Sequence, residues 1–222
     1  TEIYTLSLHD ALPIYYGNKI IIFSDKKVIK EIIKKRKFFS RKNLWAEEIA
    51  KKAFKNNNLK NVNYNGISIN TKTIKKNNLF FAIRGKNTDG HKFVKEAFKK
   101  GAIRSIVSIK KRRPSNNKII KVKNTFSSLN DLAKVTRDGT SAQIIGITGS
   151  TGKTTLKNLI GFALKNYGKV YYSPHSYNNK FGVPLSLSNL KSNTEYGVFE
   201  IGMNKKGEIN NLSKIVKPEI AI

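Results

Sequence analysis

The sequence predicts an α/β fold in two parts, a small mixed α/β domain followed by a parallel-sheet domain. From about residue 62 onward, short apolar runs of strand length alternate with amphipathic helical segments. A glycine-rich segment at residues 146–155 separates one apolar strand from a helix. Asp138-Gly139 is a break between the two regions, because both residue types favour the end of a helix or a turn.

The first domain is expected over residues 41–139. Apolar residues recur at helical spacing in three segments and form short continuous runs in three others. The predicted helices cover residues 41–54, 91–101 and 125–137, and the predicted strands cover residues 79–83, 103–109 and 119–122. Asn65-Gly66 indicates a turn, and residues 110–118 form a basic loop that contains Pro114.

The second domain is expected over residues 140–222. Strands are predicted at residues 143–148, 170–172 and 196–200, and helices at residues 153–167 and 209–216. An irregular segment rich in Asn and Pro separates the second and third of these strands. Residues 219–222 begin a further strand, so we expect this domain to be incomplete in the chain.

The N-terminal residues differ from the rest. Residues 1–14 contain no Lys or Arg and resemble the translated read-through of a sequencing adapter, so we treat them as a non-native segment. Residues 15–40 predict a strand at 19–23 and then a helix, in which Val28, Ile29, Ile32 and Ile33 form an apolar stripe.

Composition restricts the class of protein. The absence of cysteine excludes disulfides and thiolate metal sites. No apolar run approaches the roughly 18 residues that a membrane span needs. We therefore expect a cytoplasmic protein without membrane insertion. We also expect a monomer.

The formal net charge of +29 suggests nucleic-acid binding as one interpretation. The lysines are spread along the whole chain, however, and arginine, the better reader of bases, is scarce. We favour a solvated basic surface and no nucleic-acid partner. A basic nucleic-acid-binding protein with a phosphate loop remains the alternative.

Residues 146–155, GITGSTGKTT, have the features of a phosphate-binding loop and indicate an ATP-using enzyme. A strand, a glycine-rich turn and a helix N-terminus together present backbone N–H groups to phosphate. Gly149 and Gly152 allow close approach, with Ser150 and Thr151 between them. Lys153 offers a charge for the β- and γ-phosphates, Thr154 a hydroxyl for Mg²⁺, and Thr155 a second hydroxyl. Ile147 replaces the first glycine of the common G-x-x-x-x-G-K-[ST] pattern.

Four segments together carry a family resemblance. They are TGSTGKTT at residues 148–155, NNKFGVP at 178–184, VFEIGMNKKGEI at 198–209, and GKNTDGHKF at 85–93 after the LFFAI run. In this order and spacing they resemble the Mur ligases of peptidoglycan synthesis, over about residues 44–222.

The resemblance implies a UDP-substrate-binding domain at residues 41–139 and a central ATP-binding domain at 140–222. It implies amide-bond formation through an acyl phosphate, with ATP and Mg²⁺ as cofactors. The implied substrates are UDP-N-acetylmuramoyl-tripeptide and D-alanyl-D-alanine, and the implied pathway bears on cell shape and division. The family member that adds the third amino acid is the alternative.

The resemblance also implies roles for individual residues. Lys153 and Glu200 become the catalytic residues, Thr154 and Glu200 the metal ligands. Asn178 and Asn179 would face the nucleotide, although a plain turn is the alternative there. The implied UDP-substrate contacts are Asp89, Gly90, His91, Thr71 and Lys72. The last two belong to SINTK at residues 68–72, which departs from the family's S-x-D-S-R pattern.

Two further expectations concern the extent of the chain. The family's later central-domain residues and its C-terminal domain would lie beyond Ile222, so we expect the chain alone to be inactive or nearly so. Residues 15–33 resemble the tail of the preceding ligase of the pathway, which would make the chain part of a fusion. An ordinary N-terminal strand and helix is the alternative.

Overall fold

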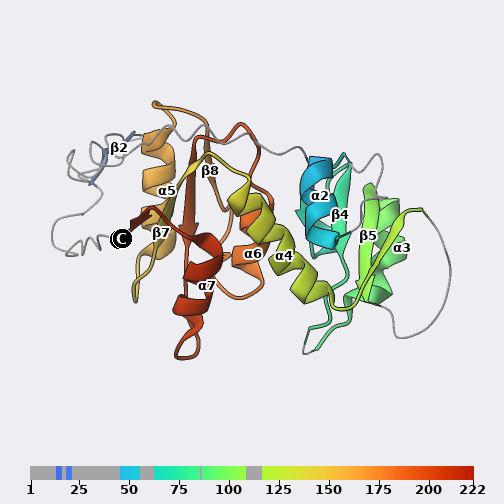
Figure 1. The fold of residues 1–222 in the computed structure, drawn as a ribbon. Coiled ribbons are helices and arrows are strands. Elements are labelled where there is room, and N and C mark those ends of the chain that lie inside the picture. The colour runs from blue at the N-terminus through green and yellow to red at the C-terminus, as the bar shows by residue number, and fades with distance from the viewer. Residues whose placement is uncertain (1–13, 17–18, 22–45, 56–62, 86, 109–116) are drawn as a thin grey trace. The chain divides into compact units, whose positions relative to one another are not determined.

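The computed structural model describes residues 14–16, 19–21, 46–55, 63–85, 87–108 and 117–222, and it shows an α/β protein (Figure 1). The larger part of the chain forms two compact units. The first unit contains residues 43–140 together with residues 184–189, and the main part of the second is residues 141–183 and 190–222. This division into two units does not test the predicted roles of the two domains in binding the UDP-linked substrate and ATP, which stay predictions.

At the N-terminus, β1 (Ile14–Tyr16) pairs antiparallel with β2 (Lys19–Ile21). The predicted strand at 19–23 therefore includes β2, whereas β1 is not predicted. The expected helix after residue 24, the non-native assignment of residues 1–13 and the basic loop at 110–116 fall outside the described residues.

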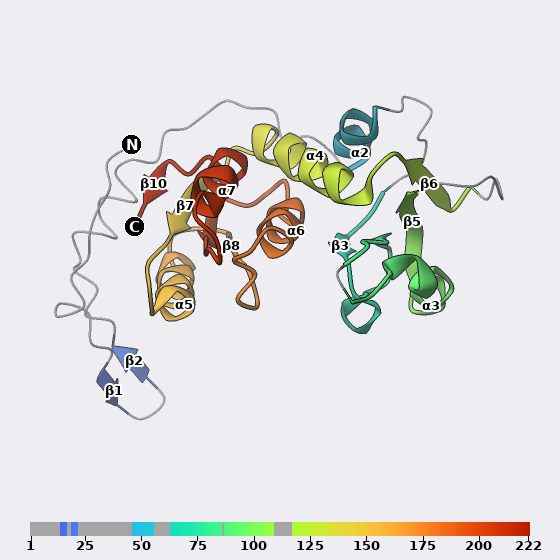
Figure 2. The ribbon, with the colours of Figure 1, turned by 90° about the horizontal axis from the view of Figure 1, so that it is seen from below.

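The first unit is built on a four-stranded parallel sheet in the order β3-β4-β5-β6. The strands are β3 (Gly66–Ser68), β4 (Asn78–Phe81), β5 (Ala102–Ser108) and β6 (Ile119–Val122). The helical segments are α2 (Ala46–Phe54), η1 (Thr71–Thr73), η2 (Gly90–Phe93), α3 (Val94–Lys99) and α4 (Thr125–Asp138). Figure 2 shows α3 on one side of β5 and the α2–α4 pair on the other.

Apolar side chains from both layers form the core of this unit. Phe80 and Ala82 pack with Ala97 of α3 and with Ala102 and Val107 of β5. The helix α4 begins at a capping residue, because the Asn124 side chain accepts a hydrogen bond from the Ser127 N–H at 2.9 Å.

The second unit has a parallel sheet in the order β10-β7-β9-β8. Its strands are β7 (Gln143–Ile147), β8 (Val170–Tyr172), β9 (Tyr196–Glu200) and β10 (Ile220–Ala221). Its helices are α5 (Lys153–Leu164) and α7 (Glu208–Val216). The helix α6 (Gly182–Ser188) begins in this unit, and its residues 184–188 belong to the first unit.

The strand order determines where the helices of this unit lie. The chain moves one way along the sheet from β7 to β8 through α5, and the other way from β9 to β10 through α7. Because parallel crossovers are right-handed, these two helices must cover opposite faces, as Figure 2 shows. The central strands β7 and β9 are consequently buried along their whole length.

Four differences from the predicted elements have physical reasons. The structure has α6 where we expected an irregular segment. Pro184 is the third residue of α6, a first-turn position where its missing N–H costs little, and Val183, Leu185 and Leu187 are buried. Gly66, for which a turn was expected, instead begins β3. The helix α5 ends at Leu164 and not at the predicted residue 167, and β4 ends at Phe81 and not at the predicted residue 83. Such differences arise because the ends of strands and helices depend on tertiary packing.

Asn189, which directly follows α6, contacts the edge strand β3 within the first unit. Its Oδ1 accepts a hydrogen bond from the Ile67 N–H at 2.8 Å, and its Nδ2 donates to the Ile67 carbonyl at 3.1 Å. Nδ2 also donates to the Leu185 carbonyl at 2.8 Å. One side-chain amide therefore satisfies both backbone groups of an edge-strand residue, much as a neighbouring strand would.

We expect Asn189→Ala to reduce the local stability of β3 by about 1–3 kcal/mol, because the Ile67 backbone groups lose their partners. Hydrogen exchange of the Ile67 amide measures this effect. Asn211→Ala, at an exposed asparagine of α7, is the control and should leave the exchange unchanged. Equal protection of Ile67 in both variants would contradict the assigned role.

Candidate functional site

The glycine-rich loop connects the buried strand β7 to the helix α5. Gly149 has φ of 147° and Gly152 has φ of 74°, both in the region that side chains disfavour. Gly152 is the N-cap of α5 and offers no side-chain cap to the first helical N–H groups. These N–H groups carry the positive end of the helix dipole and are therefore suited to bind phosphate.

Two side chains at the start of α5 are held near the loop. Lys153 Nζ donates to the carbonyl oxygens of Gly149 at 2.7 Å and Ser150 at 3.3 Å, so its ammonium lies over the loop. The Thr154 hydroxyl is 3.0 Å from the Ser176 hydroxyl. The structure thus places the lysine and the hydroxyl that the sequence singled out beside the predicted phosphate loop.

Parallel pairing brings Glu200 to the same edge of the sheet. Glu200, the last residue of β9, is in register with Ile147, the last residue of β7. The Ile201 N–H then donates to the Ile147 carbonyl at 2.7 Å. Because the carboxyl ends of parallel strands meet at one edge, the loop after β7 and the Glu200 carboxylate are neighbours, in the position where such sheets bind ligands.

A buried lysine that the sequence analysis did not single out accompanies Glu200. Lys157 Nζ lies 3.7 Å from Glu200 Oε2, and both side chains are 0% exposed. The same Nζ donates to the His175 carbonyl at 3.0 Å. Burial lowers the pKa of the Lys157 ammonium, and the negative charge of Glu200 opposes that shift. Its position four residues after Lys153, on the apolar side of the helix, was the available sequence signal.

The donor set at this edge fits a hard divalent cation. Neither Glu200 oxygen accepts a hydrogen bond from the residues that the structure describes, although both are buried. A carboxylate and a hydroxyl such as that of Thr154 are ligands that Mg²⁺ prefers, with phosphate oxygens and water completing its shell. Within the described ranges, no group of three or more His, Cys, Asp or Glu side chains is arranged to hold a metal ion.

Asn178 and Asn179 lie beside this edge with different roles. The Asn178 carbonyl accepts a hydrogen bond from the Gly202 N–H at 2.7 Å, which ties it to the residue two positions after Glu200. Asn179 Oδ1 accepts from the N–H groups of Phe181 at 3.0 Å and Gly182 at 2.9 Å, so it caps α6. A nucleotide contact by either side chain stays a prediction.

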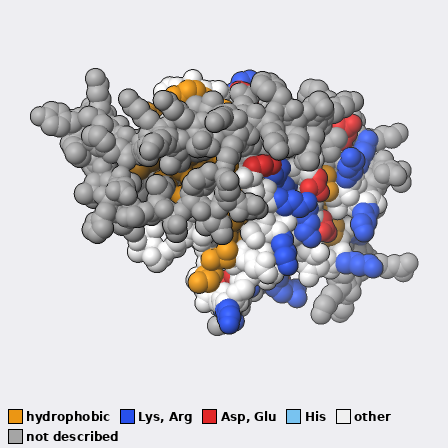
Figure 3. Space-filling model, turned by 60° about the vertical axis from the view of Figure 1, so that its left-hand side comes forward, with side chains coloured by type: hydrophobic (Ala, Val, Ile, Leu, Met, Phe, Trp, Pro, Cys, Tyr) orange, Lys and Arg blue, Asp and Glu red, His pale blue; other side chains and the backbone are white. Residues whose placement is uncertain are grey.

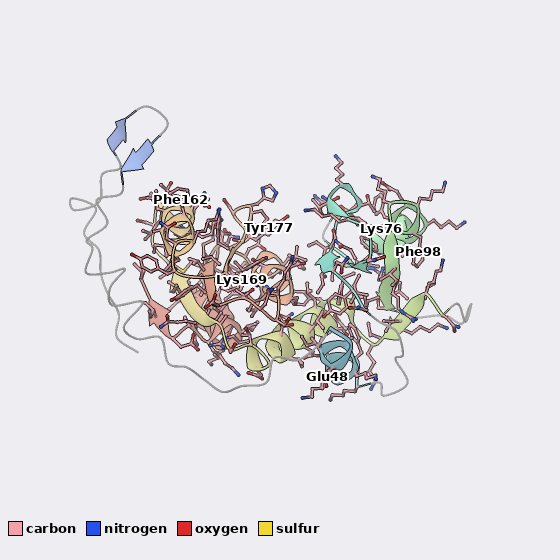
Figure 4. The ribbon with its side chains drawn as sticks, turned by 90° about the horizontal axis from the view of Figure 1, so that it is seen from above. Glu48, Lys76, Phe98, Phe162, Lys169 and Tyr177 are labelled. Atoms are coloured by element: carbon pink, nitrogen blue, oxygen red, sulfur yellow. The ribbon has the colours of Figure 1, made fainter. Side chains whose placement is uncertain are left out.

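The segment between β8 and α6 is fastened to α5. Its His175 carbonyl accepts from Lys157, and its Ser176 hydroxyl contacts Thr154. The His175 ring makes an edge contact with Tyr177, whose place in this segment Figure 4 shows. The backbone carbonyl of His175 is therefore the part of this residue that contacts Lys157.

In the first unit, Asp89 and His91 form a chain of hydrogen bonds. Asp89 Oδ1 accepts from the His91 N–H at 3.0 Å and contacts His91 Nδ1 at 2.6 Å. The Ser108 N–H donates to His91 Nε2 at 2.9 Å, so Nδ1 carries the proton of the neutral ring. A Cβ on Gly90 would lie 2.8 Å from the Ile83 backbone, so only glycine fits there. These residues fix the loop after β4, and their UDP contacts stay a prediction.

The segment of residues 68–72 is likewise organised by local hydrogen bonds. The Ser68 hydroxyl donates to the Asn70 carbonyl at 2.7 Å, and Asn70 Oδ1 accepts from the Lys72 N–H at 2.9 Å. Thr71 is buried, whereas Lys72 is exposed. The structure therefore offers Lys72 rather than Thr71 to a ligand in solution.

The basic residues of the surface do not gather into one uniform patch on the face that Figure 3 draws. Lysine and arginine side chains there are interspersed with acidic and uncharged ones. This distribution agrees with a solvated basic surface. No helix in the described part of the chain has the length and apolar character that a membrane crossing requires.

Comparison with known families agrees with the fold. The model of the Mur ligase family, catalytic domain, matches residues 63–139, and that of the Mur ligase middle domain matches residues 147–222. The chain belongs to the Mur ligase family.

Its relatives include curated UDP-N-acetylmuramoyl-tripeptide–D-alanyl-D-alanine ligases. The protein of Rickettsia prowazekii is 40% identical over 161 residues, which are 72% of this chain and 36% of the relative. That of Bacillus subtilis is 35% identical over 71% of this chain and 35% of the relative. The chain thus spans little more than a third of the length of these proteins.

Solved structures show the same relationship. A UDP-N-acetylmuramoylalanyl-D-glutamyl-2,6-diaminopimelate–D-alanyl-D-alanyl ligase from Acinetobacter baumannii has a TM-score of 0.67 and 27% identity, with 80% of this chain and 40% of that chain covered. A MurF ligase from Thermotoga maritima in complex with ADP has a TM-score of 0.58 and 32% identity, with 72% of this chain and 37% of that chain covered.

The carboxyl group of Asp89 makes the stability of the first unit depend on pH in the acid range. The His91 backbone N–H, followed by the His91 side chain and Arg84, lowers the pKa of Asp89 from 3.8 to about 2. A lowered folded-state pKa stabilises the fold above the ordinary value of 3.8, and this contribution is lost as the pH falls toward 2. We therefore expect Asp89→Ser, which keeps a capping oxygen without the charge, to weaken the decline of stability over this interval.

Thermal unfolding midpoints measured through this pH interval test the expectation. Asp131→Ser removes one carboxylate from α4 instead and is the matched control. A decline in the Asp89→Ser variant as steep as that of the unchanged chain would show that Asp89 does not carry the effect.

Proposed function

We propose that the full-length protein is an ATP-dependent ligase that joins D-alanyl-D-alanine to UDP-N-acetylmuramoyl-tripeptide in peptidoglycan precursor synthesis. The observation that carries this proposal is the shared edge of β7 and β9, where the phosphate loop and Glu200 meet. The relatives named for this reaction support the choice of substrates. The family match favours the ligase over the nucleic-acid-binding alternative.

The proposed reaction has two steps. The terminal carboxylate of the tripeptide attacks the γ-phosphorus of ATP, which gives an acyl phosphate and releases ADP. The amine of D-alanyl-D-alanine then attacks the acyl carbon, and inorganic phosphate leaves as the amide bond forms. Both steps place negative charge on phosphoryl oxygens, so a site that positions and neutralises those oxygens accelerates them.

The chain offers groups for this task at one edge of the second unit. The free N–H groups at the start of α5 would bind phosphate oxygens, and the Lys153 ammonium would neutralise the transferring group. Thr154 and Glu200 would hold Mg²⁺. The metal, when bound, would supply additional positive charge to the β- and γ-phosphates.

The first unit would bind the UDP end of the substrate. We propose that Lys72 supplies positive charge there and that Asp89, Gly90 and His91 hold the neighbouring loop in shape, while Thr71 supports η1 from inside. Cytoplasmic location, a monomeric state and a role in cell division stay predictions.

Lys153→Ala should lower the affinity of the chain for ATP by about 100-fold, because a charged donor to the phosphates is lost. Isothermal titration calorimetry with Mg-ATP measures the change. Lys165→Ala, at an exposed lysine just after α5, is the control and should bind like the unchanged chain. Unaltered affinity in Lys153→Ala would mean that the loop is not the nucleotide site.

A phosphate-release assay of the full-length gene product tests the choice of acceptor. We expect turnover with UDP-N-acetylmuramoyl-tripeptide and D-alanyl-D-alanine, and none when a diamino acid is the only acceptor. Turnover with the diamino acid alone would assign the protein to the preceding ligation of the series instead.

A further inference from the structure

Lys157 is a fully buried lysine of the helix α5 in the second unit. Lysine is almost never fully buried unless it is paired, because its ammonium loses its hydration. Lys153 and Lys157 stand one turn apart on α5, yet Lys153 lies over the loop whereas Lys157 is 0% exposed. Lys157 is therefore not placed to contact a nucleotide in the way that Lys153 is.

The contacts of Lys157 fix its charge beside the carboxylate. Its Nζ donates to the His175 carbonyl at 3.0 Å and lies 3.7 Å from Glu200 Oε2. The contact with His175 holds the ammonium from the side of the β8–α6 segment, and α5 holds the rest of the side chain. The lysine thus sits at a fixed place next to the residue that we propose as a metal ligand.

The charges at this edge set the conditions for cation binding. With Lys157 beside it, Glu200 belongs to a pair that is neutral overall, and a divalent cation added alone would leave a net charge of two in a poorly solvated place. A nucleotide brings several negative charges with the cation and removes that cost. Without the lysine, Glu200 would be a buried, unpaired carboxylate, and a lone divalent cation would compensate it.

We propose that Lys157 is a positioning and specificity residue: its ammonium balances Glu200 so that a divalent cation binds at this edge only together with nucleotide phosphates. The inference rests on the proposed function, because it assumes that Glu200 is a metal ligand. Its consequence is that the site selects the metal–nucleotide complex over the free cation.

Electron paramagnetic resonance titration of the 222-residue chain with Mn²⁺ tests the proposal, with and without ADP. The unchanged chain should bind Mn²⁺ only when ADP is present. Lys157→Met should bind Mn²⁺ without ADP, with an affinity at least about tenfold above the upper limit that the titration sets for the unchanged chain without ADP. The double variant Lys157→Met, Glu200→Gln should lose this gain.

Lys165→Met removes the same charge from an exposed position just after α5 and should behave like the unchanged chain. A purely structural role of Lys157 predicts no gain of cation binding in any variant, so the gain is the discriminating result. If Lys157→Met does not fold, Lys157→Gln replaces it. The unchanged chain also tests the proposal by itself, because it should not bind Mn²⁺ tightly without ADP.

Two results would overturn the inference. The first is tight Mn²⁺ binding by the unchanged chain without ADP, and the second is the absence of any gain in the folded Lys157 variants. A chain that binds neither ADP nor Mn²⁺–ADP would instead contradict the proposed function, so the two failures are distinguishable.

Discussion

The parallel pairing of β7 with β9 is the constraint on which the second unit depends. It sets Ile147 opposite Glu200, and so fixes the start of the phosphate loop and the end of the acidic strand at one edge. Both strands are buried between α5 and α7, which prevents a shift of register, since a slip by one residue would move every side chain to the opposite face of the sheet, against the other helix. The position of the site is therefore a consequence of core packing.

The polar groups at this edge are held from several directions. Lys157, on the buried face of α5, contacts Glu200 at the end of β9 and the His175 carbonyl. Thr154, at the start of the same helix, contacts Ser176. Asn178 contacts Gly202, just beyond Glu200. A buried ion pair often contributes little net stability, because desolvation offsets the attraction. The placement of such a pair at the proposed nucleotide-binding edge is thus better explained by function than by stability.

Much of this architecture follows from local sequence. The boundaries of β6, β8 and β9 are predicted correctly, because each is a short apolar run, and the loop residues 149–155 follow from glycine spacing. The helix α6 is missed, since GVPLSLS contains both glycine and proline, and its stability comes from burial of Val183, Leu185 and Leu187. Lys157 and the Asn189 contact to Ile67 are missed because they join residues distant in sequence.

A crystal structure of the chain with Mg²⁺ and a non-hydrolysable ATP analogue would test the central claim most directly. The account predicts phosphate oxygens on the backbone N–H groups of residues 149–155, with the metal bound by Thr154 and Glu200. Phosphates bound elsewhere, or a metal that neither residue contacts, would contradict the assignment of this edge as the nucleotide site.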